Sequence, residues 1–210
     1  MIEFRIDAPR KPRAVLLLAH GAGAGMDTPF MEELAAGLAR EAIKVLRFEF
    51  AYMAARRTGT RKPPERMPVL EERFVEAAKA ARARLPLFVG GKSMGGRVAT
   101  RVADRIGASG VLAYGYPFHP PKKPTQLRVE HLVTMSTPCL VLQGTRDPFG
   151  TPDEVLTYAL PSTLQVHWLG DGDHSLLPRK QSGRTHAQNM REAIEVSANF
   201  VTAQLSGRTR

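Results

Sequence analysis

A short glycine-rich segment near the middle of the chain constrains the fold more than any other feature. An apolar run over residues 87–89 leads into the pattern Gly91-x-Ser93-x-Gly95, and a helix-like pattern follows over residues 97–104. A serine between two such glycines is typical of a sharp turn from a strand into a helix, because a Cβ at either glycine would clash where the two elements meet. The turn strains the serine backbone and exposes its hydroxyl. The segment therefore predicts a strand–turn–helix unit with Ser93 at its apex.

The same segment also contains the end of a nucleotide-binding signature. Gly91, Lys92 and Ser93 match the last three positions of G-x-x-x-x-G-K-S, whose backbone amides cradle phosphates. The first glycine of that signature would stand five residues before Gly91, where the chain has Pro86. The residues between are apolar and indicate a buried strand, so the phosphate-loop hypothesis fails. An ordinary glycine turn is the remaining alternative, and the assignment of Ser93 depends on partner residues elsewhere.

Length and composition limit the class of protein. A chain of 210 residues can bury one sizeable core, and we expect residues 1–210 to form a single domain. Apolar runs such as residues 14–19 are too short to cross a membrane, and residues 1–7 do not have the apolar core of a signal peptide. The single cysteine, Cys139, cannot form an internal disulfide. These features predict a cytoplasmic protein without membrane insertion.

Apolar strand-like runs alternate with helix-like patterns along the chain. The predicted strands cover residues 2–7, 13–19, 44–50, 87–89, 110–116, 138–143 and 163–169. Besides the helix after Ser93, the predicted helices cover residues 28–41, 69–84, 128–135, 152–159 and 187–205, and residues 51–68 are expected to form a long basic loop. This alternation predicts one three-layer α/β domain with a mostly parallel sheet and no insertion long enough for a lid.

Three further loops leave the carboxyl ends of predicted strands, which is where open parallel sheets bind ligands. They are the glycine-rich loop at residues 20–25, the turn that contains Asp147 and the loop that ends in His174. The resulting chain order of serine, aspartate and histidine is that of the α/β-hydrolases, and it differs from the orders in the two other well-known serine hydrolase folds. The four loops together indicate acyl-transfer chemistry far more strongly than the serine motif alone.

With these residues in place, the sequence resembles the small, lid-less bacterial α/β-hydrolases related to dienelactone hydrolase. The resemblance extends from His20 to the last helix, through His20-Gly21-Ala22-Gly23, Gly91-Lys92-Ser93-Met94-Gly95, Gly144-Thr145-Arg146-Asp147 and Asp173-His174. It implies a single α/β-hydrolase domain without a lid. Dienelactone hydrolase itself has a cysteine nucleophile where this chain has Ser93, so its lactone substrate is not carried over.

Acyl-transfer chemistry gives each catalytic residue a role. Ser93 is the predicted nucleophile, and His174 is the base that takes its proton and later the acid for the leaving group. Asp147 is predicted to orient the imidazole and stabilise its charged form. Asp171 and Asp173 are the fallback acids, since they stand closer to His174 in the sequence.

An oxyanion needs preorganised donors, and the sequence offers them on two sides of Ser93. The backbone N–H of Met94 is one, and the N–H of Ala22, or next of Gly23, is the other. His20 is expected to brace this loop. The side chains of Lys92 and Met94 are expected to fill space beside the serine. The remaining histidines have no comparable strand-end position: His119, His131, His167 and His186.

Cofactor signatures do not fit. The dinucleotide pattern G-x-G-x-x-G fails in both frames of the glycine loop, because its last glycine falls on Met26 in one frame and on Thr28 in the other. No cluster of cysteine, histidine and carboxylate residues has the spacing of metal ligands. We therefore expect no cofactor and no metal ion.

The net charge of +10 is concentrated in loops at the predicted catalytic edge. We refer to five of these basic residues as the basic rim: Arg56, Arg57, Arg61, Lys122 and Arg179. One hypothesis is that the basic rim attracts anionic esters or thioesters. The alternative is a solvated surface in an arginine-rich protein.

The leading functional hypothesis is a serine hydrolase, a carboxylesterase that cleaves small-molecule esters. A thioesterase, a peptidase or an acyltransferase would use the same residues. The second hypothesis is a non-catalytic binding protein with a basic surface, which would not need an ordered set of serine, aspartate and histidine. We expect no nucleic-acid partner, and the sequence leaves the oligomeric state open.

Overall fold

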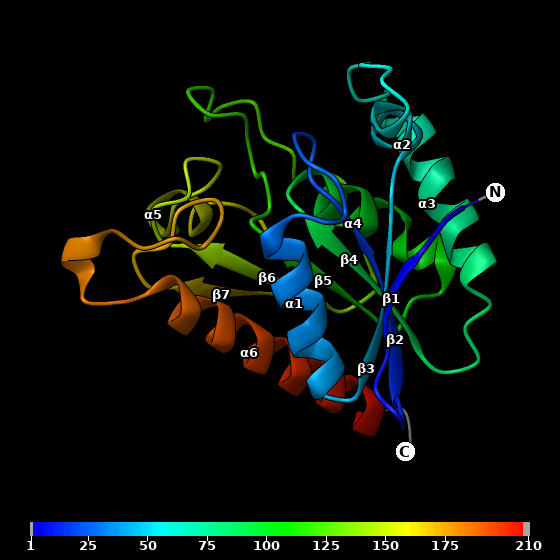
Figure 1. Ribbon diagram of the computed structural model, residues 1–210. Coiled ribbons are helices and arrows are strands. Elements are labelled where there is room, and N and C mark those ends of the chain that lie inside the picture. Colours follow the sequence, from blue (N-terminus) through cyan, green and yellow to red (C-terminus); the bar gives the residue numbers. More distant parts are fainter. Residues whose placement is uncertain (1, 208–210) are drawn as a thin grey trace.

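A seven-stranded sheet runs through the middle of the protein, as the computed structural model of residues 2–207 shows (Figure 1). The strand order is β1-β3-β2-β4-β5-β6-β7. Only β1 is antiparallel to its neighbour, which confirms the predicted mostly parallel sheet. The strands are β1 (Arg5–Asp7), β2 (Ala14–Ala19), β3 (Ile43–Phe48), β4 (Leu87–Lys92), β5 (Gly110–Tyr114), β6 (Cys139–Gly144) and β7 (Leu164–Leu169).

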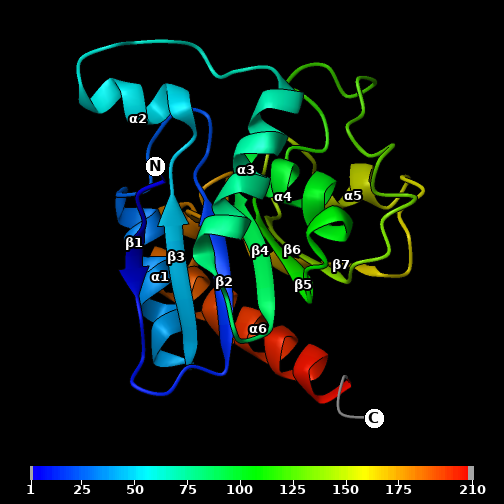
Figure 2. The same cartoon turned by 90° about the vertical axis from the view of Figure 1, so that its right-hand side faces the viewer.

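Helices cover both faces of the sheet and complete the predicted three layers (Figure 2). One face packs against α1 (Pro29–Arg40) and α6 (His186–Gly207), and the other against α3 (Met67–Ala81) and α4 (Met94–Ile106). Two short helices, α2 (Ala51–Arg57) and α5 (Pro152–Val155), and the 3₁₀ turn η1 (Lys180–Ser182) lie outside these layers. Residues 2–207 contain no lid domain, and none of their helices has the length and hydropathy needed to cross a membrane.

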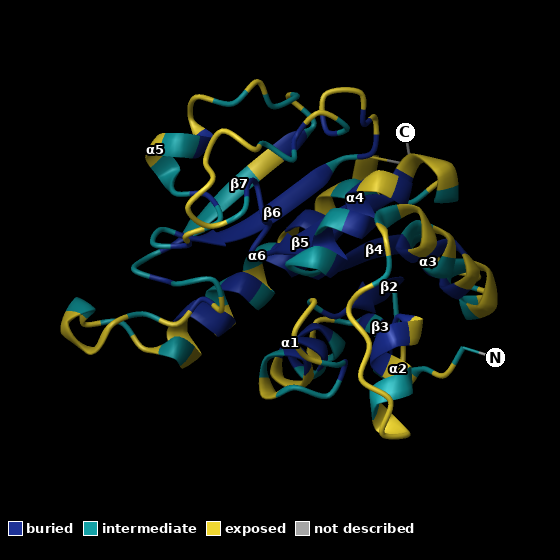
Figure 3. Ribbon diagram, turned by 90° about the horizontal axis from the view of Figure 1, so that it is seen from above, coloured by how far each residue is buried: buried dark blue, intermediate teal, exposed yellow. Residues whose placement is uncertain are grey.

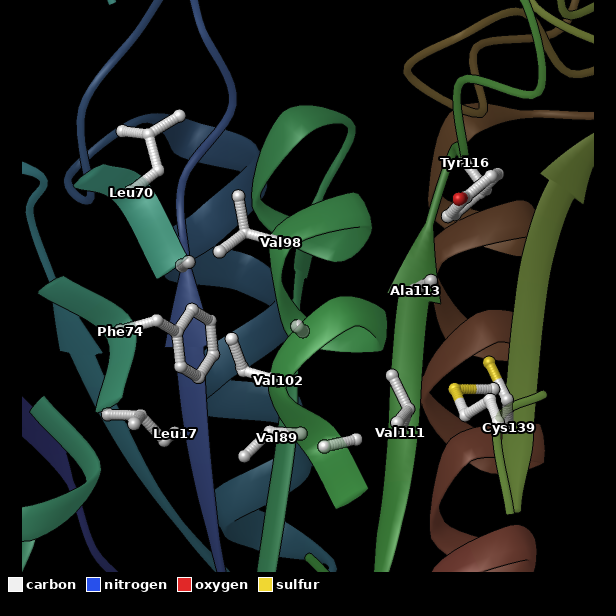
Figure 4. Packing of buried hydrophobic residues seen from close by; sticks show 14 of the residues in the cluster. Leu17, Leu70, Phe74, Val89, Val98, Val102, Val111, Ala113, Tyr116 and Cys139 are labelled. Carbon is white, nitrogen blue, oxygen red and sulfur yellow. The ribbon is translucent and has the colours of Figure 1, made fainter. Parts of the chain in front are cut away.

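The continuous apolar runs of the sequence follow from burial on both faces of the sheet. Along β2, all six residues are buried, with Leu16 and Leu18 facing α1 and α6 while Val15 and Leu17 face the other helix pair. Figure 4 shows Phe74 of α3 close to Leu17 on that second face. Fully burying a side chain of this size contributes about 1.5–3 kcal/mol, so the central strands carry much of the core energy.

The edge of the sheet is less buried than its centre (Figure 3). Every residue of β6 is buried, whereas β7 is partly exposed. Exposed residues gather in the loops beside the carboxyl ends of the strands (Figure 3). The sheet therefore gives the strand-end loops a rigid base and leaves them accessible.

The structure corrects three predicted elements. The predicted loop at residues 51–68 begins with α2, which forms because Tyr52 and Met53 are buried against the core. The predicted helix at residues 128–135 is wrong: these residues form turns that bury every third side chain, at Val129, Leu132 and Met135. The predicted helix at residues 152–159 ends already at Val155.

Candidate active site

Ser93 lies at the turn between β4 and α4, with φ 52° and ψ −115°. A Cβ on Gly91 would lie 2.5 Å from the carbonyl carbon of Gly95, and a Cβ on Gly95 would lie 2.6 Å from the carbonyl oxygen of Ala19. Neither neighbour can move, because both are backbone atoms of the central elements. The backbone N–H of Ser93 donates to the carbonyl oxygen of Tyr114 at 2.9 Å. Close packing thus holds the serine in a conformation that residues other than glycine rarely adopt.

The structure brings Ser93, Asp147 and His174 together from the ends of β4, β6 and β7. The Nε2 atom of His174 lies 2.9 Å from the Oγ atom of Ser93, and its Nδ1 atom lies 2.8 Å from the Oδ2 atom of Asp147. A carboxylate only accepts hydrogen bonds, so we assign the proton to Nδ1. The Nε2 lone pair is then free to accept the hydroxyl proton of Ser93.

Asp147 has no solvent exposure, and two groups besides His174 satisfy its carboxylate. The backbone N–H of Phe149 donates to Oδ1 at 2.9 Å, and the side-chain amide of Gln143 donates to Oδ2 at 2.9 Å. The Gln143 amide is itself fixed, because its oxygen accepts the Tyr116 N–H at 2.7 Å. Sequence reasoning missed Gln143, although a buried polar residue at the end of an apolar strand gave an indication of it.

The two fallback acids have other partners. Asp171 pairs with Arg179 and Arg146, and the bonds from Arg179 lower the pKa of Asp171 to about 2. Asp173 accepts the backbone N–H groups of Ser175 and Leu177 at 2.7 and 3.0 Å and so shapes its own loop. Asp147 is the carboxylate that contacts the His174 ring.

His20 braces the glycine-rich loop, in agreement with the predicted position. Its Nε2 atom accepts the N–H of Phe50 at 3.1 Å, which leaves Nδ1 to donate to the carbonyl oxygen of Gly21 at 2.7 Å. Burial lowers the pKa of His20, so the ring is neutral at neutral pH. The other histidines have other partners. His131 contacts Thr100, His167 contacts Glu192, His119 contacts Glu154, and His186 contacts the carbonyl oxygen of Ser175.

The glycine-rich loop passes beside Ser93, and Ala22 and Gly23 line the same pocket as the serine. The Tyr52 hydroxyl donates to the carbonyl oxygen of Ala22 at 3.0 Å, which fixes the orientation of that peptide. Met94 is the first residue of α4, where backbone N–H groups have no acceptor within the helix. The predicted oxyanion donors therefore lie at the pocket, and their role stays a prediction.

Charged side chains hold the far end of this loop. The carboxylate of Glu49, which is 6% exposed, accepts the Met26 N–H at 3.2 Å, while Arg47 donates to the Met26 carbonyl oxygen at 2.7 Å. Arg57 bonds both oxygens of Glu49, at 2.7 and 2.8 Å, and also contacts Asp27 at 3.0 Å. We call these five residues the anchor network of the loop: Asp27, Arg47, Glu49, Arg57 and Met26.

A pocket of about 440 Å³ opens at Ser93 and His174. Its walls are mostly apolar side chains, from Ala22, Ala24, Pro29, Phe30, Met31 and Phe149. The Phe149 ring lies against the His174 ring, with 4.3 Å between centroids. A larger groove of about 600 Å³ lies between α1 and α6, and Ser93, Asp147 and His174 do not line it. We therefore place the candidate site in the smaller pocket.

The basic rim lies outside that pocket, since none of its five residues lines it. Arg57 is bound to Glu49 and Asp27, and Arg179 is bound to Asp171. Arg56 stacks 5.4 Å from the centre of the Tyr52 ring. Arg61 and Lys122 are exposed. Carboxylates thus offset part of the predicted positive charge, and the attraction of anionic substrates stays a prediction.

Metal ligands are not grouped in the described part of the chain: no three or more histidine, cysteine, aspartate or glutamate side chains are placed to hold an ion. Lys92, expected only to fill space, instead has a specific polar contact. Its ammonium donates to the backbone carbonyl oxygen of His174. A lysine directly before the serine gave no indication of this contact, because its partner lies 82 residues further along the chain.

Comparison with known proteins agrees with this geometry. The family profile of the alpha/beta hydrolase domain matches residues 12–202. The protein is similar in structure to XC6422 from Xanthomonas campestris, described as a serine hydrolase without a lid, at 17% identity and TM-score 0.71, over 94% of this chain and 88% of that one. It is also similar to a dienelactone hydrolase from Anabaena variabilis, at 20% identity and TM-score 0.71, over 92% and 89% of the two chains.

A third similar structure is Est1E from Butyrivibrio proteoclasticus, at 9% identity and TM-score 0.73, over 98% of this chain and 95% of that one. At such identities these proteins share the fold. Together with the family profile, they confirm the predicted resemblance to lid-less α/β-hydrolases and support a hydrolase. Because the profile spans most of the sequence, the chain belongs to the alpha/beta hydrolase family.

Proposed function

We propose that the protein is a serine hydrolase that cleaves small carboxylesters through Ser93, His174 and Asp147. The observation that carries the proposal is the unbroken chain of contacts from the buried Asp147 carboxylate through His174 to the Ser93 hydroxyl, with distances of 2.8 and 2.9 Å. This chain ends at a pocket large enough for a small ester. A binding protein would have no need of such an arrangement.

Acylation follows from these positions. His174 Nε2 takes the proton of Ser93 as Oγ attacks the ester carbonyl carbon, and the carbonyl oxygen becomes an oxyanion. The N–H groups of Met94 and of Ala22 or Gly23 stabilise that charge, and one such donor contributes about 3 kcal/mol. The C–O bond to the alcohol then breaks, and the alcohol leaves with the proton from His174.

Deacylation repeats the sequence with water. His174 removes a proton from a water molecule, the resulting oxygen attacks the acyl carbon, and Ser93 leaves with the proton that His174 returns. Asp147 stabilises the charged imidazole in both halves of the reaction. Because its carboxylate is buried and receives two further hydrogen bonds, its position is fixed before the substrate arrives.

The pocket supports an ester with an apolar acyl or alcohol group. Its walls carry many more apolar than polar groups, and the basic rim does not line it. An anionic ester remains the alternative substrate, attracted by the rim from outside. Matched neutral and carboxylated esters, assayed at low and high salt, separate the two: the rim hypothesis requires a faster and salt-sensitive reaction of the carboxylated ester.

The test of the nucleophile is labelling with a fluorophosphonate probe, which reacts with activated serines. We expect the wild type to be labelled and Ser93→Ala to be unlabelled. Ser175→Ala is the matched control, because Ser175 lines the same pocket and is exposed. Labelling that survives in Ser93→Ala, or a folded wild type that is never labelled, would overturn the proposal. The second result would favour the non-catalytic binding protein.

Substrate class requires a separate measurement. Esters, thioesters and amides with the same acyl group distinguish a carboxylesterase from a thioesterase or a peptidase, and added alcohols reveal acyl transfer. We expect the highest kcat/KM for a carboxylester. A thioester preferred by more than about tenfold, equivalent to about 1.4 kcal/mol, would change the assignment while leaving the catalytic residues in place.

A further inference from the structure

Lys92 joins two parts of the site that are far apart in the sequence. It is the last residue of β4 and stands directly before Ser93. Side chains alternate along a strand, and Phe88 of β4 packs on the face that α1 and α6 cover. Lys92 therefore points to this face, where its Nζ atom lies 5.6 Å from the centre of the Phe30 ring.

The ammonium group of Lys92 donates to the backbone carbonyl oxygen of His174. The residue next to the proposed nucleophile thus binds the main chain of the proposed base itself. One other contact described above joins this part of the chain to the histidine loop. It is the contact between Ser93 and His174, which the proposed reaction breaks. Lys92 provides a link between them that can persist through the catalytic cycle.

Gly115 leaves room for this contact. It has φ 63°, and a Cβ at this position would lie 2.7 Å from Lys92 Nζ, 2.8 Å from the His174 carbonyl oxygen and 3.2 Å from His174 Nδ1. Any larger residue would therefore separate the ammonium from its acceptor and push on the imidazole. The glycine directly after β5 thus permits the contact between Lys92 and His174.

Burial makes the charged form of Lys92 energetically unfavourable at this place. Burial lowers its pKa to about 8, against the opposing attraction of Asp147 and Asp173. Those two carboxylates and His174 are the titratable groups that face the ammonium, from the ends of β6 and β7, while α1 presents the uncharged Phe30 ring. A partly buried cation with one carbonyl acceptor adds little to stability, which favours a functional role for the contact.

We propose that Lys92, in its charged form, is a positioning residue whose ammonium holds the His174 backbone and keeps the imidazole aligned between Asp147 and Ser93. The inference rests on the catalytic roles proposed above. Loss of the Lys92 proton weakens this hold, because an amine is a poorer donor than an ammonium. The reactivity of Ser93 then falls as the pH rises through about 8.

Stability changes in the opposite direction over the same range. The ordinary pKa of a lysine, 10.5, lies above the value of about 8 in the folded protein. Between these values the unfolded state binds more protons than the folded state, so the free energy of unfolding increases with pH. Opposite responses of reactivity and stability to one proton would not arise if Lys92 only filled space.

The experiment measures the rate of fluorophosphonate labelling of Ser93 from about pH 6 to about pH 10, corrected for loss of the probe. We expect a wild-type rate that falls above pH 8, and a Lys92→Met rate that is about ten- to a hundredfold lower at neutral pH and does not fall further. Lys79→Met, an exposed lysine of α3, is the matched control and keeps the wild-type profile.

Chemical rescue adds a second variant. Lys92→Cys treated with 2-bromoethylamine forms a thioether that ends in an ammonium, as its thiolate displaces bromide. Cys139 is fully buried and burial raises the pKa of its thiol, so it does not compete. We expect alkylation to restore the labelling rate to within about tenfold of the wild type, and treated wild type to stay unchanged.

The outcomes are distinct. A folded wild type that is not labelled overturns the proposed function. A labelled wild type with a Lys92→Met rate within about twofold of it overturns the positioning role. If Lys92→Met does not fold, the wild-type profile decides alone: a rate that stays level or rises between pH 8 and 10 rejects the role of the charged lysine.

Discussion

Two loops meet at Ser93, and they are held in different ways. Residues 20–28, here called the oxyanion loop after their proposed role, are fixed at the far end by the charged side chains of the anchor network, of which Arg47 and Glu49 are buried. The histidine loop, residues 170–179, is held along its length by neutral and charged groups. Asn189 donates to the carbonyl oxygens of Gly170 and Leu176 at 3.1 and 2.8 Å, and Arg146 donates to that of Asp171 at 2.9 Å. Lys92 holds the main chain of this loop at His174 itself.

The difference matches what each loop has to do. In the proposed reaction the oxyanion loop presents fixed donors and does not change charge, so strong ion pairs can hold it rigidly. In the proposed reaction the imidazole of the histidine loop gains and loses a proton in every cycle, and it lies between the negative charge of Asp147 and the positive charge of Lys92. Substitutions in the two loops and beneath them test this contrast, and they are taken in order of decreasing effect.

The largest loss is expected when the histidine loses its carboxylate. In Asp147→Asn, the amide no longer stabilises the charged imidazole and favours the wrong tautomer, so kcat should fall by about 10⁴-fold with little change in KM. Steady-state kinetics on the best ester measures this. Asp173→Asn is the matched control from the histidine loop, and a larger loss in that variant would make Asp173 the catalytic acid.

A smaller loss is expected when the oxyanion loop loses its anchor. Glu49→Gln keeps the shape of the side chain but weakens its bonds to Arg57 and to the Met26 N–H. We expect kcat to fall by about 10- to 100-fold, below the loss of a whole oxyanion donor, because the loop shifts but its amides remain. Arg57 is 41% exposed and can be hydrated, so the free energy of unfolding should fall by only about 1–2 kcal/mol.

The control for this change is Glu32→Gln, which removes an exposed carboxylate that pairs with Arg5 on the same side of the sheet. Its activity and thermal midpoint should match those of the wild type. Equal kinetics in Glu49→Gln and Glu32→Gln would mean that the anchor network is a stability device without influence on the oxyanion donors.

A still smaller effect is expected from Gln143→Met, which lies beneath both loops. The change removes one hydrogen bond to Asp147 and leaves the Tyr116 N–H without its acceptor. We expect a loss of about 2 kcal/mol in the free energy of unfolding, measured by urea denaturation, and about a tenfold loss in kcat. A stability loss with unchanged kcat would show that Phe149 and His174 alone orient the carboxylate.

The sequence predicted the sheet well because burial on both faces leaves long apolar runs, as in residues 14–19. It failed where local pattern and tertiary packing disagree. The basic residues of α2 concealed a helix that Tyr52 and Met53 fix to the core. In residues 128–135, a three-residue apolar spacing fits successive turns as well as a helix, and only the surrounding core decides between them.

For the site, the sequence predicted the residues that stand at strand ends, since topology alone brings Ser93, Asp147 and His174 to one edge of the sheet. It did not predict the contacts of Lys92, Gln143 or Glu49. Their side chains bond to partners in the loops and turns at the strand ends. Such contacts depend on where a long side chain ends, and the spacing of residues along one element carries no information about that.

The smallest effect is expected from Arg179→Gln at the outer end of the histidine loop. Arg179 holds the pKa of Asp171 at about 2, so this pair contributes stability above the ordinary aspartate pKa near 4 and loses it as the pH falls from about 4 to about 2. The Arg179 side chain is 53% exposed, so solvent screens the pair and the thermal midpoint at neutral pH should hardly change. The informative measurement is kcat/KM for matched neutral and carboxylated esters. If Arg179 is fully occupied by Asp171, both values stay within about twofold of the wild type. A selective loss for the carboxylated ester, not seen in the control Arg191→Gln on α6, would show that the basic rim recruits anionic substrates and that the histidine loop uses its charges for binding as well as for shape.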